Sequence, residues 1–411
     1  MEWLGDIPAH WDVQRLGLLF SESNARASSD TEKEYPILSV SIHDGISDTE
    51  MSDGELDRKV ARSKDRSLYK VVHENDLAYN MMRAWQGGFG SAKVTGLISP
   101  AYVVCRPKTV ACSAFFEQVL RTPNAISELR RYSRGITDFR LRLYWDDFKT
   151  ILVPVPPETE RKSIQEFLDY ETAKIDALIE KQQQLIDFLK EKREGLLHVA
   201  ISEKGTKKIR LENCWEIVSR PITRLDSEIY HPIGLLNRGR GVFHKDPTLG
   251  SDLGDSDFFY VEEGDLILSG QFAWEGAVAL AGEEESRCVA THRYPIVRSK
   301  PGVTETAFLW ALFASQIGHF LLNENSRGAA GRNRPLNMNS LMKEKILVPP
   351  LEAQQAVAKL VLREKALREY IQQPIALLQE RRTALISAAV TGKIDVRGWK
   401  APDSQVKAEV A

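Results

Sequence analysis

The sequence predicts an α+β protein made of two similar units, each a globular region of mixed sheet and helix followed by one long helix. The first observation behind this prediction is that short motifs of the first half recur, in the same order, in the second half. The second is that each set of motifs ends in about forty residues with apolar side chains at helical spacing. The third is that short β-rich runs between Gly, Asp and Pro residues fill the regions in front of these helices.

The repeat is defined by three motifs. ENDL at 74–77 recurs as EGDL at 263–266, SRG at 133–135 recurs at 326–328, and ILVPVPP at 151–157 recurs as ILVPP at 346–350. Asp265 lies 189 residues after Asp76, and Pro349 lies 195 residues after Pro154. The constant order and nearly constant offset indicate a duplication inside one chain. They place one globular region at 1–155, a helix at 156–204, a second globular region at 205–350, and a second helix with a tail at 351–411.

Two long helices follow the repeated proline motifs. Pro156 and Pro157 end a strand, and the acidic residues after them favour a helix from Glu158 to about Glu203. A second helix is expected from about Leu351 to Thr391, with a bend at Pro374. Alternating steps of three and four residues predict a coiled-coil seam. The seam residues are Leu168, Ile175, Leu178, Leu185, Leu189, Leu196 and Val199 in the first helix, and Leu360, Leu367, Ile371, Leu378 and Leu385 in the second.

The seam has two interpretations. Heptads commonly form a dimer between chains, whereas the duplication favours pairing of the two helices within one chain. If they pair antiparallel, the globular regions are expected at opposite ends, related by an approximate two-fold rotation. The second helical region is about six residues shorter than the first. The repeat offset falls from 195 between Pro154 and Pro349 to 189 between Leu196 and Leu385. This difference argues against an ideal symmetric spacer.

Composition narrows the class of protein. The chain has 411 residues, 43% hydrophobic and 27% charged, with a formal net charge of −2. This balance suits a globular protein of two or more domains, and it excludes a uniformly basic surface. The four scattered cysteines suggest reduced thiols in the cytoplasm. The sequence contains no run of about 18 apolar residues, so we expect no membrane span.

Two segments at matched positions are locally basic. Residues 121–149 hold seven basic and four acidic side chains, and residues 324–345 hold five and two, so both carry +3. Arginine binds phosphates and can donate two hydrogen bonds to guanine, and asparagine can pair with adenine. The alternative for any single residue is an ordinary solvated arginine; the matched position of both segments favours DNA contact. The candidate DNA-binding residues are Arg134, Thr137, Arg140, Arg142, Arg327, Arg332, Asn333, Arg334 and Asn337, with Arg83 and Lys93 in a glycine-rich loop.

Trp85 and Trp274 lie 189 residues apart, so both globular regions carry an aromatic residue at the same point of the repeat. Packing in the core is the favoured interpretation of each tryptophan, and neither is a candidate site residue.

Motifs for catalysis are missing from the sequence. It has no G-x-x-x-x-G-K-[ST] phosphate loop, no glycine fingerprint between a strand and a helix, and no histidine pair at metal-binding helical spacing. It also lacks the aromatic-Pro-Pro tetrapeptide of amino-methyltransferases, and Glu160 to Lys162, its only Glu-x-Lys, begins a helix. These features favour a binding protein over an enzyme.

Three stretches resemble those of one known family. WLGDIPAHWDVQRL at 3–16, ILVPVPP at 151–157 and SAAVTGKIDVRGW at 387–399 are similar to stretches of type I restriction-modification specificity subunits. The resemblance spans essentially the whole chain, and it implies two target recognition domains that alternate with two long helical regions and read a bipartite, asymmetric site in double-stranded DNA. It also implies that residues 391–399 pack back against the N-terminal recognition domain.

The resemblance further implies partners. In that family the specificity chain joins two modification subunits, which bind S-adenosylmethionine and methylate adenine, and restriction subunits that hydrolyse ATP and cleave DNA. S-adenosylmethionine, ATP and Mg²⁺ are therefore expected on the partners, and no cofactor or metal is expected in this chain. Two helices alone leave part of each seam exposed, so helices of the modification subunits are expected to complete a bundle. The candidate docking residues are Leu178, Leu185, Leu367 and Leu378.

Two other classes of function stay open at this point. One is a single-chain nuclease or methyltransferase whose catalytic centre lacks a familiar motif; activity of the chain alone on DNA would support it. The other is a coiled-coil DNA-binding or scaffold protein outside restriction-modification. Sequence-selective DNA binding by an assembled complex would argue against a scaffold.

Overall fold

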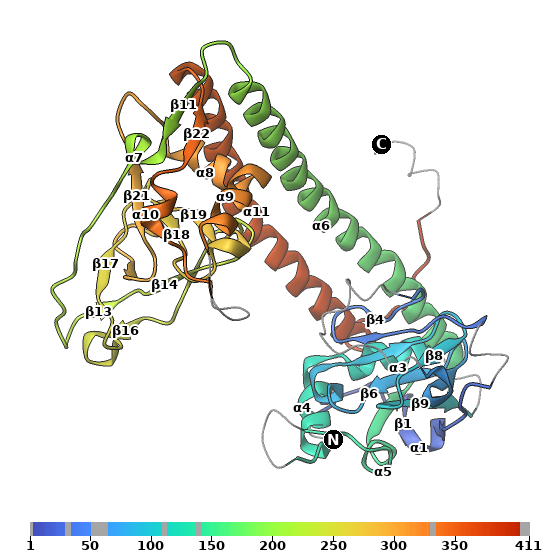
Figure 1. Ribbon diagram of the computed structural model, residues 1–411. Helices are drawn as coiled ribbons and strands as arrows, with labels where there is room; N and C mark the ends of the chain where they lie inside the picture. Colours follow the sequence, from blue (N-terminus) through green and yellow to red (C-terminus); the bar gives the residue numbers. More distant parts are fainter. Residues whose placement is uncertain are drawn as a thin grey trace. The chain divides into compact units, whose positions relative to one another are not determined.

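The computed structural model describes residues 3–28, 34–50, 65–108, 113–135, 141–326, 328 and 334–402. These residues form two compact units (Figure 1): the first comprises the residues up to Ile179 and from Ile375 onward, and the second is Glu180–Pro374. Each unit contains one globular region and a part of both long helices, α6 (Glu158–Ile201) and α11 (Leu351–Val390). The predicted α+β class, the two long helices and the internal repeat are confirmed.

The first unit is built on an antiparallel sheet of order β2-β9-β6-β7, beside three strand pairs: β1 with β10, β3 with β4, and β5 with β8. Its strands are β1 (Asp12–Arg15), β2 (Phe20–Ser23), β3 (Val40–Ser41), β4 (Gly45–Ile46), β5 (Lys70–Val72), β6 (Leu77–Asn80), β7 (Phe89–Ser91), β8 (Gly96–Ile98), β9 (Tyr102–Pro107) and β10 (Leu152–Val155). Its short helices are α1 (Leu16–Leu19), η1 (Arg66–Leu68), η2 (Ala84–Gln86), α3 (Ser113–Leu120), α4 (Pro123–Tyr132) and α5 (Trp145–Phe148).

The second unit has a sheet of order β12-β21-β18-β19, with strand pairs β11–β22, β13–β16, β14–β15 and β17–β20. Its strands are β11 (Lys207–Arg210), β12 (Trp215–Ile217), β13 (Ile229–Tyr230), β14 (Ile233–Leu235), β15 (Val242–His244), β16 (Thr248–Leu249), β17 (Phe258–Tyr260), β18 (Leu266–Leu268), β19 (Val278–Leu280), β20 (Val289–Thr291), β21 (Ile296–Ser299) and β22 (Lys345–Val348). Its short helices are α7 (Leu211–Cys214), η3 (Gly250–Asp252), η4 (Ala273–Glu275), α8 (Thr306–Ala314), α9 (Gln316–Glu324) and α10 (Met338–Leu341).

The two units share one topology. In the second unit β12, β21, β18 and β19 take the places of β2, β9, β6 and β7, and α8 and α9 those of α3 and α4. The repeated proline motif has the same role in both, because β10 pairs antiparallel with β1, and β22 with β11. The duplication that was inferred from short repeated motifs therefore extends over whole domains.

The repeated ENDL and EGDL motifs form a tight turn with a buried carboxylate. Asp76 Oδ2 accepts a hydrogen bond from the N–H of His73 at 2.9 Å, and Arg106 of β9 donates to the same oxygen at 3.1 Å. Asp265 is fully buried and is bound by Arg298 of β21 at 2.5 Å. A buried carboxylate needs such donors, so this pair holds the turn that leads into the central strand. The motif is structural in both units.

The cores are large and aromatic. In the first unit the rings of Tyr79, Phe89 and Phe148 lie within 4.7–5.8 Å of one another, and in the second Trp215 stacks on Phe313 at 5.1 Å. Cys105, Cys214 and Cys288 are buried free thiols, and burial raises the pKa of Cys214 to about 11. Cys112 lies outside the described residues. Among the described helices, none is long and apolar enough to cross a membrane.

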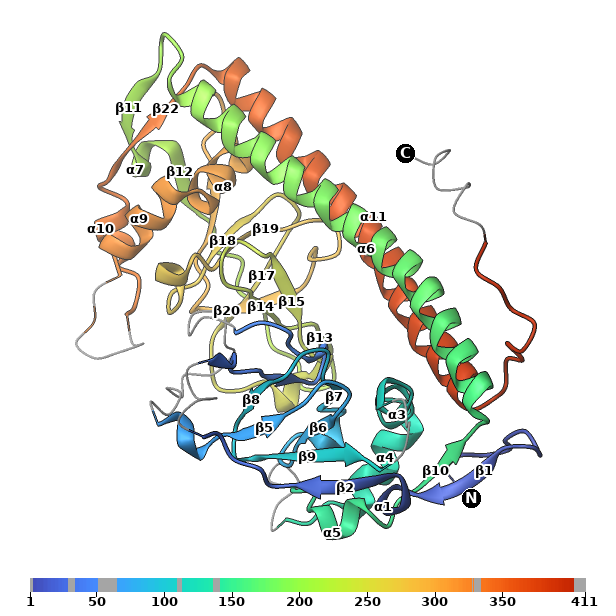
Figure 2. The same ribbon diagram turned by 90° about the vertical axis from the view of Figure 1, so that its right-hand side faces the viewer.

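In each unit, α6 and α11 run side by side in opposite directions (Figure 2). Asp176 pairs with Arg382 at 2.9 Å in the first unit, and Arg193 pairs with Glu364 at 2.7 Å in the second. The expected pairing within one chain is therefore confirmed. Helix α11 continues through Pro374 without interruption. The bend expected at this proline stays a prediction.

The residues predicted for the seam of α6 are partly wrong. Leu168 and Ile175 are buried, but Leu178, Leu185 and Val199 are 51%, 44% and 68% exposed. A strict repeat of 3.5 residues drifts around a straight helix of 3.6 residues per turn, so the buried side moves away from the predicted positions. The buried side of α6 instead includes Ile164, Leu168, Ile175, Ile186, Arg193 and Leu197, and Arg193 pairs with Glu364 of α11.

The tail after α11 belongs to the core of the first unit, as the family resemblance implied. Val396 is buried in the cluster that contains Trp11, and Ile394 and Trp399 pack against the same cluster. The Trp399 ring meets Phe167 of α6 edge-on, at 5.5 Å between ring centroids. The C-terminal tail thereby joins the N-terminal segment to α6.

Replacing Trp399 with alanine should lower the free energy of unfolding of the first unit by about 2 kcal/mol. Full truncation of a buried aromatic costs about 3–5 kcal/mol, and Trp399 is only partly buried. Denaturant unfolding of the full chain measures this loss. Lys400→Ala, at the exposed neighbouring position, is the control. Equal effects of the two changes would contradict the packing role of Trp399.

Candidate nucleic-acid interface

The basic segment of the first unit, residues 121–149, contains α4 and continues beyond the end of that helix at Tyr132. Arg134 and Arg142 form an antiparallel bridge in which each N–H donates to the other carbonyl at 2.9 Å. The side chain of Arg134 is exposed and pairs with Asp147 at 2.5 Å. Arg142 is exposed as well. The segment therefore returns on itself and presents both guanidinium groups to solvent.

The basic segment of the second unit has the same construction. Ser326 and Leu336 form its antiparallel bridge, and Arg334 is exposed and lies over the ring of Trp274 at 5.1 Å. Asn337 caps α10, because its Oδ1 accepts the N–H of Ser340 at 3.0 Å. Asn337 therefore has a structural role as a helix cap, and the proposal of DNA binding does not depend on it.

Several candidates from the sequence cannot be placed. Thr137 and Arg140 of the first segment, and Arg327, Arg332 and Asn333 of the second, lie outside the described residues. Lys93 is exposed and lines a pocket with His43, Asp44 and Arg121, whereas Arg83, Arg134 and Arg142 do not line that pocket.

A matched loop lies beside each basic segment. In the first unit it joins β6 to β7 through η2, and in the second it joins β18 to β19 through η4. Both end in a glycine in the left-handed region, Gly87 with φ 86° and Gly276 with φ 72°. Residues with a side chain rarely adopt this conformation. Arg83, a candidate from the sequence, is exposed on the first loop.

Backbone hydrogen bonds join each loop to its basic segment at matched positions. Leu143 donates to the carbonyl of Met81 at 2.9 Å, and Leu336 donates to the carbonyl of Gly270 at 2.8 Å. Both donors lie in the basic segment, and both acceptors lie in the loop. The structure thus brings together residues that are 62 positions apart in the first half of the sequence and 66 positions apart in the second.

The two tryptophans of the repeat lie in these loops, each under an arginine. Arg130 lies over Trp85 at 5.7 Å, and Arg334 lies over Trp274 at 5.1 Å. Both rings are half-buried. The cations come from different positions of the repeat: Arg130 lies on α4, and Arg334 lies between the bridged residues Ser326 and Leu336. Sequence reasoning treated the tryptophans as core residues and missed this arrangement, although their 189-residue offset was a signal.

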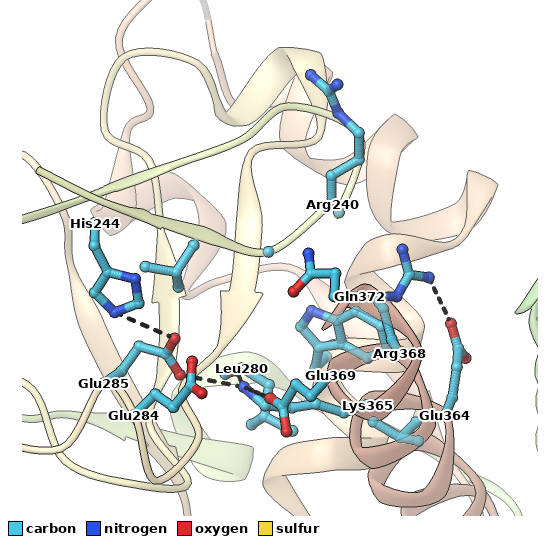
Figure 3. A pocket seen from close by; sticks show the side chains of 15 residues that line it. Arg240, His244, Leu280, Glu284, Glu285, Glu364, Lys365, Arg368, Glu369 and Gln372 are labelled. Carbon is cyan, nitrogen blue, oxygen red and sulfur yellow. Dashed lines mark hydrogen bonds and ion pairs between the residues drawn. The ribbon is translucent and has the colours of Figure 1, made fainter. Parts of the chain in front are cut away.

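A separate charged pocket of about 280 Å³ lies in the second unit, between α11 and the loop after β19 (Figure 3). Lys365 donates to the carbonyl of Leu280 at 2.9 Å and pairs with Glu285 at 3.2 Å; His244 lies 3.7 Å from Glu285. Because these charges compensate one another, we interpret the pocket as a joint between the helix and its globular region. In the described part of the chain, no group of three or more acidic, His or Cys side chains could hold a metal ion.

Fold and site together define a class of protein: a duplicated α+β chain in which each unit presents a basic segment and a loop joined by matched hydrogen bonds. Its fold is that of type I restriction-modification specificity subunits. A chain from work on complex assembly and conformational transition of the type I R-M system is 17% identical, with a TM-score of 0.50 over 95% of this chain and 100% of that one. The S subunit from M. genitalium is 13% identical, with a TM-score of 0.50 over 95% and 98%. No family model and no curated protein matches the sequence.

Proposed function

We propose that this chain is the DNA-recognition subunit of a type I restriction-modification complex. Each globular region reads one half of a bipartite, asymmetric site in double-stranded DNA, and α6 with α11 docks two modification subunits. Restriction subunits join the same cytoplasmic assembly. S-adenosylmethionine, ATP and Mg²⁺ bind to these partner subunits. The chain itself performs no catalysis.

The observation that carries this proposal is the matched pair of loop and basic segment in two units of one topology. A protein that reads two half-sites needs two similar surfaces with positive charge for the phosphates. The arginines at 134, 142 and 334 supply that charge on exposed segments, each of which is closed by an antiparallel backbone bridge. The two surfaces differ in their side chains, which suits half-sites of different sequence.

Mapping methylated adenines in the host genome, with the gene intact and deleted, tests the proposal. We expect one bipartite sequence to be methylated only when the gene is intact. An unchanged methylation map would reject the proposal. The purified chain alone is expected to neither cleave nor methylate DNA with Mg²⁺ or S-adenosylmethionine; activity of the chain alone would support an enzyme instead.

A further inference from the structure

We infer that the tips of the two matched loops are nucleobase-binding sites that set the sequence of each half-site. The tips are Met82 and Arg83 in the first unit and Gln271 and Phe272 in the second. This inference rests on the proposed function and assigns the reading of bases to named residues. Phe272 and Gln271 were not among the candidates from the sequence.

The framework of the two loops is the same. In the first, the N–H of Asn80 donates to the carbonyl of Gly88 at 3.0 Å, and the N–H of Gly88 donates to Arg83 O at 3.0 Å. In the second, the N–H of Ser269 donates to Ala277 O at 3.0 Å, and the N–H of Ala277 donates to Phe272 O at 3.3 Å.

The residue two positions before each tip also has a matched role. Asn80 Oδ1 accepts the N–H of Met82 at 3.0 Å, and Ser269 Oγ accepts the N–H of Phe272 at 3.0 Å. A polar side chain at this position therefore fixes the direction in which the tip leaves the sheet. The loops are held by these side chains, by backbone atoms and by the left-handed glycines.

The two loops have the same backbone hydrogen bonds, but the side chains at their tips differ. Arg83 in one loop stands where Phe272 stands in the other, and Met82 where Gln271 stands. Met82 is 46% exposed and Phe272 is 39% exposed, and Arg83 and Gln271 are exposed too. These side chains are open to solvent at matched tips, and each loop is hydrogen-bonded to its basic segment, so a ligand bound along that segment can reach them.

The chemistry of the tips fits bases and not phosphates alone. Each loop is hydrogen-bonded to its basic segment. When the arginines of that segment bind DNA phosphates, they therefore hold the neighbouring tip close to a groove of the DNA. Arg83 can donate two hydrogen bonds to guanine O6 and N7. Phe272 can contact a thymine methyl group or wedge between base pairs, and Gln271 can pair with adenine. The first half-site is therefore expected to contain a guanine at the contacted position, and the second an A·T pair.

The test exchanges the tips in the complete restriction-modification complex and maps methylated sites. Met82→Gln with Arg83→Phe should change or relax one or two positions of one half-site, with at least about a tenfold loss of preference for the original base. Gln271→Met with Phe272→Arg should do the same to the other half-site only. Glu352→Gln, at an exposed position of α11, is the control and should leave the map unchanged.

The outcomes separate the inference from the proposed function. If the unaltered complex shows no methylation that depends on the gene, the proposed function fails. If it does, and both exchanged complexes methylate the original sequence with the original preference, the assignment of the tips fails while the function stands. Complexes that assemble but lose methylation support the assignment. Where an exchanged chain fails to assemble, Arg83→Lys and Phe272→Leu decide: relaxed reading of one half-site supports the tips, and unchanged reading overturns them.

Discussion

Replacing Glu364 with leucine should lower the free energy of unfolding of the second unit by about 3–5 kcal/mol. Arg193 and Glu364 are 4% and 3% exposed, and both carboxylate oxygens accept from Arg193 Nη1, at 2.9 and 2.7 Å. Arg193 also lies over the ring of Trp310 at 4.8 Å. Without the carboxylate, a guanidinium charge stays buried between α6 and α11, where water cannot solvate it.

Denaturant unfolding measures this effect, and the chain offers a matched control. Asp176 and Arg382 form the corresponding pair between the same helices in the first unit, but they are 51% and 40% exposed. Asp176→Leu should therefore cost no more than about 1 kcal/mol. Arg193→Met combined with Glu364→Leu should recover most of the lost stability, because the buried guanidinium is removed as well, while Arg368, which also pairs with Glu364, is 39% exposed and can be solvated by water. Similar costs for Glu364→Leu and Asp176→Leu would show that burial does not decide the strength of these pairs.

Leu178→Glu combined with Leu185→Glu should abolish co-purification of the chain with the modification subunit. Both leucines are about half exposed on α6, although their spacing is typical of an apolar seam. If partner helices cover them, each new carboxylate would be buried without a partner on association, which costs several kcal/mol. The chain alone should keep its stability, since the substitutions do not reach its core.

Gln184→Glu is the control for this experiment, because it adds a carboxylate at an exposed position of α6 beside Leu185 but turned by about 100° around the helix. It should leave co-purification intact. Unchanged co-purification of the double variant would reject these leucines as docking residues. Leu367 and Leu378 of α11 are half-buried, so we expect weaker effects from changes there.

The sequence predicted the arrangement of the chain better than its helix packing. Constant offsets between repeated motifs are independent of tertiary detail, so they identified the duplication. The prolines and acidic residues at 156–160 likewise predicted the start of α6 at Glu158. Burial along α6 depends on small differences in helix rotation. Over more than forty residues the difference between 3.5 and 3.6 residues per turn becomes decisive, and Leu178, Leu185 and Val199 were therefore assigned to the wrong side.

The candidate site was only partly accessible to sequence reasoning. Charge counts identified the segments around Arg134 and Arg334, because local charge can be read without a fold. The hydrogen bonds that join these segments to the loops could not be foreseen, since they link residues such as Met81 and Leu143 across the sheet and its connections. Likewise, the EGDL motif does not indicate that Asp265 is fully buried and bound by an arginine from another strand.

The division of labour within each loop has an evolutionary consequence. The glycine, the capping side chain and the backbone hydrogen bonds hold the loop, while the side chains at its apex take no part in these hydrogen bonds. Mutation at the apex is therefore nearly neutral for folding, and each domain can drift without disturbing the other. If the apex side chains read DNA as proposed, a lineage of such proteins can acquire a new target one half at a time while the chain stays stable.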